Sequence, residues 1–337
     1  MSSVAVVILN FNGKELLKKF LPGVIQHSPA ASIIVADNNS NDGSREFLAK
    51  EFPAIEVIPI PTNLGFCGGY NYALRQVKAD YYLLLNSDVE VTANWLTPLM
   101  ELLNSDQTIA AVQPKILSFN NRDKFEHAGA GGGLIDTFGY PFCRGRIFDQ
   151  VEEDSGQYDD SIPVFWSSGA CMLIRASLFQ SFKGFDETFF AHMEEIDLCW
   201  RLKRAGHRIM YCGASKVYHM GGGTLSESNP KKTYYNFRNG LILLIKNLDP
   251  LDLAIKLPIR VILDTIAAIK FLASGQGGSF LAVANAHFFI LTRFFALLGK
   301  RTGYPYKVDL IYPGSIVFDY FLAGKGKFQD LDFSNPK

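Results

Sequence analysis

Residues 81–89 place a carboxylate directly after a run of apolar side chains. The leucines at 83–85 occupy consecutive positions, which is typical of a strand covered on both faces. Asp88 follows within the polar triplet 86–88, and ligands gather at the carboxyl ends of strands in open α/β sheets. A hard oxygen ligand there could hold a divalent metal against a substrate phosphate. An ordinary Asx turn fits the same residues, so this pattern alone leaves both interpretations open.

Two adjacent acids, Glu194 and Glu195, begin a predicted helix after the aromatic stretch 189–193. Acids are common at helix N-termini because they complement the helix dipole. Carboxylates in a partly apolar site can also act as general bases. Asp197 is spaced to pair with Arg201 four residues later, and we interpret that pair as structural.

His219 precedes three glycines at 221–223. The glycines would let the imidazole lie near a phosphate or a metal, and imidazole is a common metal ligand. A lone histidine is more often a core or surface residue, so both interpretations stay open.

Other predicted strand ends also carry polar residues. Asp37 follows the strand 32–36, where a carboxylate can bond the base or ribose of a nucleotide. Asn63, Gly65 and Gly69 belong to a glycine-containing loop before a helix, where a ligand can approach backbone N–H groups. Ordinary turn chemistry explains each of these alone. The loop is not a GxGxxG arrangement, which disfavours a dinucleotide site.

The elements that position these residues alternate along the chain. Strands are expected at 4–9, 32–36, 55–60 and 81–85, with helices at 14–24, 44–51 and 70–77 between them. This alternation predicts an α/β fold with a mostly parallel, doubly wound sheet. Further strands are expected at 109–114, 165–174 and 208–212. The segment 129–160 is rich in loop residues and is expected to be mobile without a ligand.

Composition excludes several classes of protein. Lys plus Arg and Asp plus Glu both number 33 among 337 residues, so no basic excess supports nucleic-acid binding. The five cysteines form no CxxC pair, which argues against a zinc cluster or disulfide framework and fits a reducing compartment. The N-terminus has no basic region before its first apolar run, so no signal peptide is expected. No window reaches about 18 uninterrupted apolar residues, so no membrane-spanning helix is expected.

The region after residue 240 is apolar and carries interspersed basic and aromatic residues. Lys256, Arg260 and Lys270 lie among aliphatic side chains, and Arg293, Lys300 and Arg301 accompany four phenylalanines. This pattern predicts interfacial membrane helices. An apolar face packed on the catalytic domain, or on a second subunit in a homodimer, is the alternative.

The motifs, in this order, resemble the inverting glycosyltransferases of family 2, which have a GT-A fold, and within them the rhamnosyltransferase-like branch. The matching segments are residues 6–12, 35–44, 63–71, 84–88, 169–175, 194–201 and 219–223. The resemblance implies a nucleotide-diphosphate sugar donor, a divalent metal (magnesium or manganese), and inversion at the anomeric carbon. A catalytically degenerate sugar-nucleotide-binding module remains an alternative. A nucleotidyltransferase is disfavoured, because only Lys14 provides basic charge near the loop after the first strand.

The resemblance also implies roles for individual residues. Asp88 would coordinate the metal at the DxD position, whose first acid is Asn86 here, and His219 would complete the metal shell. Glu195 matches the catalytic base, with Glu194 as the next candidate. The residues expected to bind the nucleotide sugar are Asn10, Asn12, Asp37, Asn63, Gly65, Gly69, Asn86 and Arg238.

Two further residues are expected on the acceptor side, Trp166 and Gly169. Trp166 is either a platform for the acceptor sugar or a core aromatic. Arg238 either approaches the diphosphate or caps an acid. One displacement inverts the anomeric configuration, so no protein nucleophile is expected.

The resemblance implies a place for the protein in the cell. Members of this branch build bacterial surface polysaccharides, so the acceptor would be a glycan or a lipid-linked glycan. We expect a cytoplasmic protein, peripheral to the inner face of the plasma membrane. The expected division is a GT-A nucleotide-sugar-binding and catalytic domain at 1–240, amphipathic helices at 241–323, and a polar, poorly ordered tail at 324–337.

Overall fold

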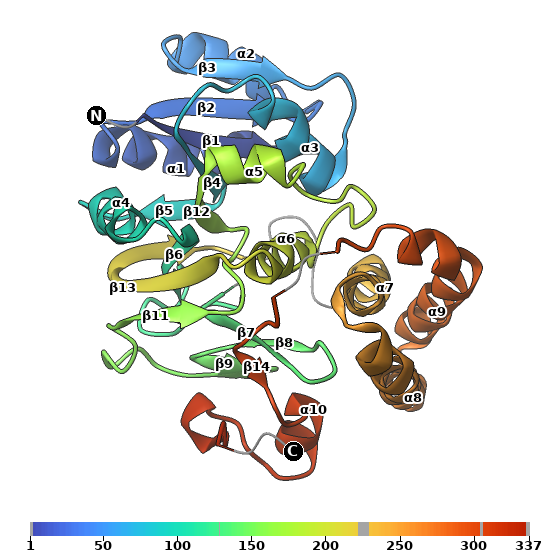
Figure 1. Cartoon of the computed structure of the whole chain (residues 1–337). Helices are drawn as coiled ribbons and strands as arrows, with labels where there is room; N and C mark the ends of the chain where they lie inside the picture. Colours follow the sequence, from blue (N-terminus) through green and yellow to red (C-terminus); the bar gives the residue numbers. More distant parts are fainter. Residues whose placement is uncertain (1–2, 128, 222–228, 304–305, 335–337) are drawn as a thin grey trace.

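The computed structural model describes residues 3–127, 129–221, 229–303 and 306–334 (Figure 1). Four parallel strands form one half of its central sheet, in the spatial order β3-β2-β1-β4. They are β1 (Val4–Asn10), β2 (Ser32–Asp37), β3 (Glu56–Pro59) and β4 (Tyr81–Asn86), joined through α1 (Lys14–His27), α2 (Ser44–Glu51) and α3 (Gly65–Leu74). This half confirms the predicted strand–helix alternation.

The run of leucines behaves as predicted. The first five residues of β4 are buried. Tyr82 and Leu84 belong to one hydrophobic cluster, whereas Leu83 and Leu85 belong to another. Because side chains alternate across a strand, β4 is covered on both faces, and its polar residues fall at its carboxyl end.

Beyond β4 the pairing changes direction. β12 (Cys171–Arg175) runs antiparallel to β4 and to β6 (Ile109–Ser118), and β13 (Arg208–His219) runs parallel to β6. β5 (Val89–Val91) and β11 (Ser161–Val164) each pair antiparallel with β13. The sheet is therefore parallel in its first half and mixed in its second. The remaining helices of this part are α4 (Leu96–Ser105), α5 (Ala176–Ser181) and α6 (Glu194–Arg204).

A second, smaller sheet occupies the segment that was expected to be a loop. Its order is β10-β9-β8-β7-β14, from β7 (Gly133–Asp136), β8 (Pro141–Cys143), β9 (Arg146–Ile147), β10 (Gln150–Val151) and β14 (Ile311–Tyr312). Leu134, Ile135, Phe142 and Ile147 are buried against the main core. The expectation of a mobile loop is wrong there, because these short strands bury apolar side chains.

Three helices form a bundle beside the sheet (Figure 1). They are α7 (Pro230–Asn247), α8 (Pro250–Ala273) and α9 (Gly277–Leu298). α7 begins with proline after Asn229, whose side chain accepts a hydrogen bond from the Lys231 N–H. α9 packs along α7 and α8, and its residues Ala282, Val283 and Ala286 are buried.

α9 corrects the expectation about helix length. It is long and apolar enough to cross a membrane by length and composition, and about 28% of its apolar window is buried. Counting uninterrupted apolar residues missed it, because isolated polar side chains interrupt an otherwise apolar helix.

The chain end also differs from the expected tail. After α10 (Ile316–Phe321) and a 3₁₀ turn (Phe328–Asp330), the Phe328 N–H donates to the Glu152 carboxylate at 3.0 Å. The Phe333 ring contacts the rings of Tyr312 and Phe328. The described part of the tail therefore returns to the small sheet, held by its aromatic side chains (Figure 1).

Candidate active site

The carboxyl ends of neighbouring strands bring the predicted polar residues to one edge of the sheet. Asn10, the last residue of β1, lies opposite Asp37, the last residue of β2. Asn86, the last residue of β4, lies opposite Leu9 of β1. Asp88 follows in the turn to β5, and its backbone carbonyl accepts from the Met220 N–H at 3.0 Å. The sheet thus gathers residues from four separate segments.

Asp88 and His219 form a buried pair. His219 Nε2 lies 3.1 Å from Asp88 Oδ1, and Asn86 Nδ2 lies 3.5 Å from the same nitrogen. On the other side of the ring, Nδ1 lies 3.0 Å from Glu126 Oε2. Burial lowers the pKa of His219, but Asp88 and Glu126 outweigh it and raise that pKa to about 10.

Glu126 is a residue that the sequence did not single out. It lies between β6 and the small sheet, and its backbone N–H donates to the Ile116 carbonyl. No spacing or motif marks it, because only the fold brings it against His219. Carboxylates in this position behind a histidine fix the ring orientation in many metal sites.

The Asp88–His219 pair fits a divalent metal by its donor chemistry. Magnesium and manganese prefer oxygen ligands, and the Asp88 carboxylate provides one. Imidazole nitrogen, as in His219, is also a common ligand of divalent metals in proteins. Asp88 Oδ1 and His219 Nε2 lie 3.1 Å apart, so the two side chains could hold one divalent ion together. Within the described ranges, no group of three or more His, Cys, Asp or Glu could hold an ion by itself. Asp88 and His219 are therefore the two residues here that would hold a metal.

Asp37 lies in a closed hydrogen-bonded cluster. It accepts from Asn10 Nδ2 at 3.1 Å and from the Ser40 N–H at 3.0 Å, and Arg45 Nε lies 3.6 Å away. Asn10 Oδ1 is buried and has no hydrogen-bond partner among the described residues. A Cβ built on Gly13 would lie 2.5 Å from that oxygen, so a larger residue there would displace the Asn10 side chain. Asn10 thus keeps one free acceptor at the strand ends.

The remaining expected donor residues have local partners. Asn12 has a left-handed backbone (φ 52°), and its Oδ1 accepts from the Asn41 N–H. Asn63 Oδ1 accepts from the Gly65 N–H at 2.9 Å. A Cβ on Gly65 would lie 2.7 Å from the Phe190 ring, and one on Gly69 would lie 2.8 Å from Leu9. These glycines permit close packing, and contact with a donor stays a prediction.

Glu194 and Glu195 begin α6, as predicted. Burial and the nearby Glu195 raise the pKa of Glu194 well above its usual value. Glu195 is only partly buried. Burial raises its pKa to about 7, although the N–H groups of Glu195, Gly169 and Ile196 favour its charged form. One oxygen of each carboxyl, Oε2, is buried without a hydrogen-bond partner from the described residues. A carboxylate with such a pKa is suited to take up a proton near neutral pH.

The two residues expected on the acceptor side, Gly169 and Trp166, differ in their surroundings. Gly169 lies beside the base candidate, since a Cβ built on it would lie 4.0 Å from Glu195 Cβ. Trp166 is only 5% exposed, and its indole N–H donates to the Leu134 carbonyl at 2.9 Å. The ring also fills the space beside Gly133. The interpretation of Trp166 as an acceptor platform is therefore wrong, because the side chain joins the two sheets in the core.

Arg238 also differs from expectation. It is buried, and its guanidinium donates to the backbone carbonyls of Thr188 and Phe189 at 3.0 and 2.8 Å. These contacts are to backbone carbonyls, so they do not cap an acid, and they do not involve the residues at the strand ends. Asp197 and Arg201 form the predicted structural pair, at 2.9 Å.

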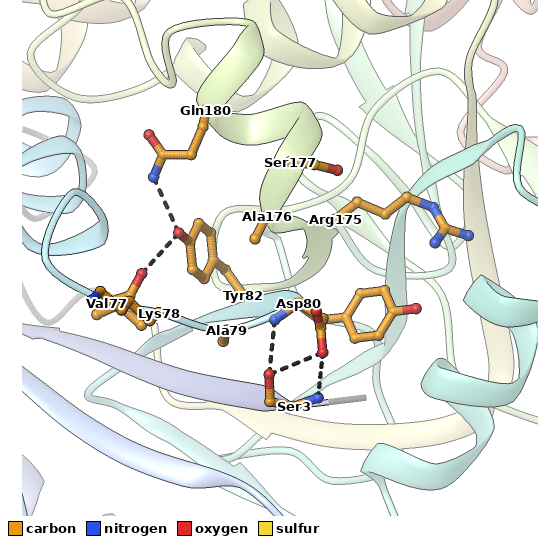
Figure 2. Close-up of a pocket in the computed structure, with 11 residues that line it drawn as sticks. Ser3, Val77, Lys78, Ala79, Asp80, Tyr82, Arg175, Ala176, Ser177 and Gln180 are labelled. Atoms are coloured by element: carbon orange, nitrogen blue, oxygen red, sulfur yellow. Dashed lines mark hydrogen bonds between the residues drawn. The ribbon is translucent and has the colours of Figure 1, made fainter. Parts of the chain in front are cut away.

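A pocket of about 770 Å³ lies at the opposite edge of the sheet (Figure 2). Figure 2 shows Ser3 bonded to Asp80, and Gln180 bonded to the Tyr82 hydroxyl. None of the predicted site residues lines this pocket. It surrounds the start of β4, whereas the candidate site lies beyond the end of that strand.

Comparisons with known proteins identify a family. The family described as Glycosyl transferase family 2 matches residues 5–182. An N-acetylglucosaminyl-diphospho-decaprenol L-rhamnosyltransferase of Mycobacterium tuberculosis is 26% identical over 233 residues, covering 64% of this chain and 75% of the relative. Rhamnosyltransferase WbbL of Escherichia coli is 26% identical over 229 residues, covering 64% of this chain and 83% of the relative.

Solved structures share the fold. Mannosyltransferase PcManGT from Pyrobaculum calidifontis, in complex with GDP-Man and Mn²⁺, has a TM-score of 0.53 and 13% identity, covering 89% of this chain and 84% of that one. GalNAc-T7 with UDP, GalNAc and Mn²⁺ has a TM-score of 0.55 and 16% identity, covering 73% of this chain and 48% of that one. These likenesses confirm the expected α/β fold of GT-A type.

Proposed function

The chain belongs to glycosyl transferase family 2, and on this premise we propose that it is a metal-dependent inverting hexosyltransferase. It moves a sugar from a nucleotide-diphosphate donor to a hydroxyl of a glycan or lipid-linked glycan. The observation that carries the proposal is the position of Glu195 at the start of α6 beside Gly169, where burial gives its carboxyl a raised pKa that suits a general base. The rhamnosyltransferase relatives make activated L-rhamnose the first donor to test.

Glu195 acts on the acceptor. Its carboxylate takes the proton from the acceptor hydroxyl while that oxygen attacks the anomeric carbon. The C–O bond to the diphosphate breaks in the same displacement, so the configuration inverts. Its Oε2 atom is buried and has no hydrogen-bond partner among the described residues, so a bound acceptor hydroxyl that reaches it would supply one.

The donor lies along the strand ends in this proposal. Asp88 and His219 would hold the magnesium or manganese ion, which when bound neutralises charge on the leaving diphosphate. Asp37 and Asn10 would lie at the nucleoside, and the buried Oδ1 of Asn10 has no hydrogen-bond partner among the described residues. Asn86 lies between the two groups, beside the His219 ring.

The helical bundle supplies the membrane contact. Its large apolar side chains are exposed along one side of α8 and on α9. They are Leu251, Ile255, Ile259, Ile262, Ile266, Ile269 and Leu272 on α8, and Leu281, Phe288, Leu291 and Phe295 on α9. The spacing of three, four or seven residues puts those of each helix on one face. The M. tuberculosis relative is named for a decaprenol-linked acceptor, and a lipid-linked acceptor would meet the protein at such a surface.

The basic residues of the bundle point elsewhere. Arg260 is buried against Asp264 at 2.9 Å, Lys300 binds Asp186 at 2.9 Å, and Arg301 donates to backbone carbonyls. The expected basic membrane face is therefore wrong for these three, because each has an internal acceptor. The proposed attachment rests on apolar burial at the inner face of the plasma membrane. In this division residues 1–240 perform catalysis, and helices within 241–323 attach the protein.

Membrane attachment is tested by sedimentation with neutral phosphatidylcholine vesicles. Ile266→Asp, at a position 57% exposed, loses about 1.5 kcal/mol or more of apolar burial, so binding should weaken at least tenfold. Gln76→Asp on the catalytic unit adds the same charge and should bind like the wild type. Equal sedimentation of both variants contradicts the proposal. If Ile266→Asp instead dissociates a dimer in ultracentrifugation without changing vesicle binding, the face is a subunit contact.

Donor binding is tested by thermal shift. A panel of nucleotide-diphosphate sugars, including an activated L-rhamnose, is added with Mn²⁺ or Mg²⁺. We expect a rise in Tm with one donor only when metal is present, and no metal-dependent rise in Asp88→Ala. A donor-induced rise that persists in Asp88→Ala contradicts the metal assignment. Donor binding without transfer to any acceptor would favour a degenerate binding module.

A further inference from the structure

The segment 189–193 that precedes α6 is held in an unusual backbone conformation. Phe190, His192 and Met193 have φ angles of 65°, 70° and 72°. Side chains disfavour this left-handed region, at a cost on the order of 1 kcal/mol for each residue. Met193 is also the residue directly before α6, and its side chain makes no capping hydrogen bond. Contacts from elsewhere in the fold must therefore hold this segment.

Asn239 of α7 supplies these contacts. Its Nδ2 lies within hydrogen-bond distance of three backbone carbonyls, those of Phe189 at 3.1 Å, Ala191 at 2.8 Å and His192 at 2.7 Å. Its Oδ1 accepts from Arg238 Nε at 2.9 Å. Asn239 is fully buried, so water does not replace these bonds.

Neighbouring groups hold the other half of the segment. The Phe190 carbonyl accepts from the N–H groups of Phe66 and Cys67 at the start of α3, at 2.9 and 3.2 Å. The Phe190 ring stacks on Tyr235 of α7, with ring centroids 5.6 Å apart. These contacts do not involve Asn239, so loss of Asn239 would release residues 191–193 while Phe190 stays anchored.

We infer that Asn239 is a positioning residue for the reaction, which fixes the left-handed turn at residues 191–193 and thereby the direction in which Glu195 leaves α6. The inference rests on the proposed role of Glu195 as base. Asn239 contacts only backbone of the segment, two residues before Glu194. Asn239 would therefore affect turnover only through the position of the Glu195 carboxylate, which this segment sets.

The position of Asn239 predicts an effect on turnover rather than on donor binding. Of the donor-side residues, Asn10 and Asp37 are held by the sheet and by each other, and Asp88 is held by the Met220 N–H and His219. A base displaced by about 1 Å can lower turnover roughly 100-fold. Asn239→Asp keeps the shape of the side chain but turns the donor into an acceptor facing three carbonyls. We expect kcat to fall about 100-fold while the Kd for the donor stays within about twofold.

Arg175 offers a matched control. It is also buried and also donates to three backbone carbonyls, those of Ile109, Leu103 and Asp106, but at the opposite edge of the sheet (Figure 2). Arg175→Met should lower the Tm as much as Asn239→Asp or more, because it too leaves buried carbonyls without donors. Its kcat should stay near that of the wild type.

The experiment compares the full-length wild type, Asn239→Asp, Arg175→Met and Glu195→Gln for Tm, donor Kd, kcat and the pH dependence of kcat. Met193→Gly added to Asn239→Asp relieves backbone strain and should recover part of the lost Tm, which provides a folded variant if the single one aggregates. The positioning role also predicts that the pH midpoint of kcat moves in Asn239→Asp and not in Arg175→Met.

The outcomes separate the inference from the proposed function. A wild-type kcat in Asn239→Asp, with Glu195→Gln inactive, overturns the inference alone. Equal losses of kcat in Asn239→Asp and Arg175→Met show a merely structural role, which also overturns it. Near-normal turnover of Glu195→Gln overturns the assignment of the base itself.

Discussion

The buried carboxylate of Asp197 allows a stability prediction with a worked magnitude. Asp197 is fully buried in the first turn of α6. It accepts from Arg201 Nε, Lys246 Nζ and Asn247 Nδ2, each at 2.9 Å. The helix that carries the proposed base is thus bound to α7 through one side chain. Asp197→Asn keeps the shape of the side chain and removes its charge.

The expected loss of unfolding free energy in Asp197→Asn is at the lower end of the range for breaking a buried ion pair. Removing one partner typically costs 3–5 kcal/mol, because the other charges stay buried without compensation. Lys246 keeps Asp186 at 2.7 Å, and Arg201 keeps the carbonyls of Phe182 and Gly184, so we expect about 3 kcal/mol. An unfolding entropy of about 2.1 cal/mol/K per residue gives about 0.7 kcal/mol/K for 337 residues, so Tm should fall by about 4 °C.

The assay is thermal unfolding of the full chain, with Glu90→Gln as control. Glu90 pairs with Arg122 at 2.8 Å, but both side chains are substantially exposed, so its loss should cost less than about 1 kcal/mol. Although burial opposes it, the pairing with Arg201 and Lys246 holds the pKa of Asp197 below its usual value. Its stabilisation is therefore present above pH of about 4 and is lost as the pH falls further. A Tm for Asp197→Asn equal to that of Glu90→Gln at pH 7 would refute the reasoning.

Two further predictions concern the site. First, kcat should fall about tenfold per pH unit below a midpoint near pH 7, because Glu195 must be deprotonated to accept a proton. Glu194→Gln, the control, should leave that midpoint in place. A kcat that stays constant from pH 5.5 to 8, under conditions where chemistry limits the rate, would contradict the prediction. Second, Glu126→Gln should weaken Mn²⁺ binding by about 10- to 100-fold, because it removes the charge that holds His219 Nδ1. The affinity is measured by electron paramagnetic resonance of free Mn²⁺, and an unchanged affinity would mean that Glu126 has no part in the site.

The parallel half of the sheet and the strand-end residues could be predicted from sequence for a physical reason. Buried strands such as β4 are continuous apolar runs, and the first polar residue after each run marks an edge of the sheet. Asp37, Asn86 and Asp88 follow this rule, so their neighbourhood could be expected before the fold was known.

The features that could not be predicted depend on contacts between distant segments. β14 pairs with β7 across more than 170 residues, and strands of two to four residues carry too few side chains for a periodic signal. Glu126 meets His219 only because β6 and β13 are neighbours. Arg260 sits in an apolar helix and looks interfacial, but Asp264 one turn later draws it inward.

The same limit applies to large side chains near the site. Trp166 and Arg238 have the residue types of a sugar platform and a phosphate ligand, and each meets backbone carbonyls instead. Residue type alone cannot distinguish a side chain that faces a substrate from one that satisfies the fold. That Arg238 and Asn239 donate to backbone carbonyls within residues 188–192 can be recognised only from the fold, which packs α7 beside that segment.

The assignment of Glu195 as the base is tested most directly by comparing turnover with donor binding in Glu195→Gln. This change replaces one carboxylate oxygen by an amide and keeps the size of the side chain. The account predicts that transfer falls at least about 100-fold, while the Kd for the metal-bound donor, measured by calorimetry, stays within about twofold. Transfer within about threefold of the wild type would contradict it and would make Glu194 the next candidate.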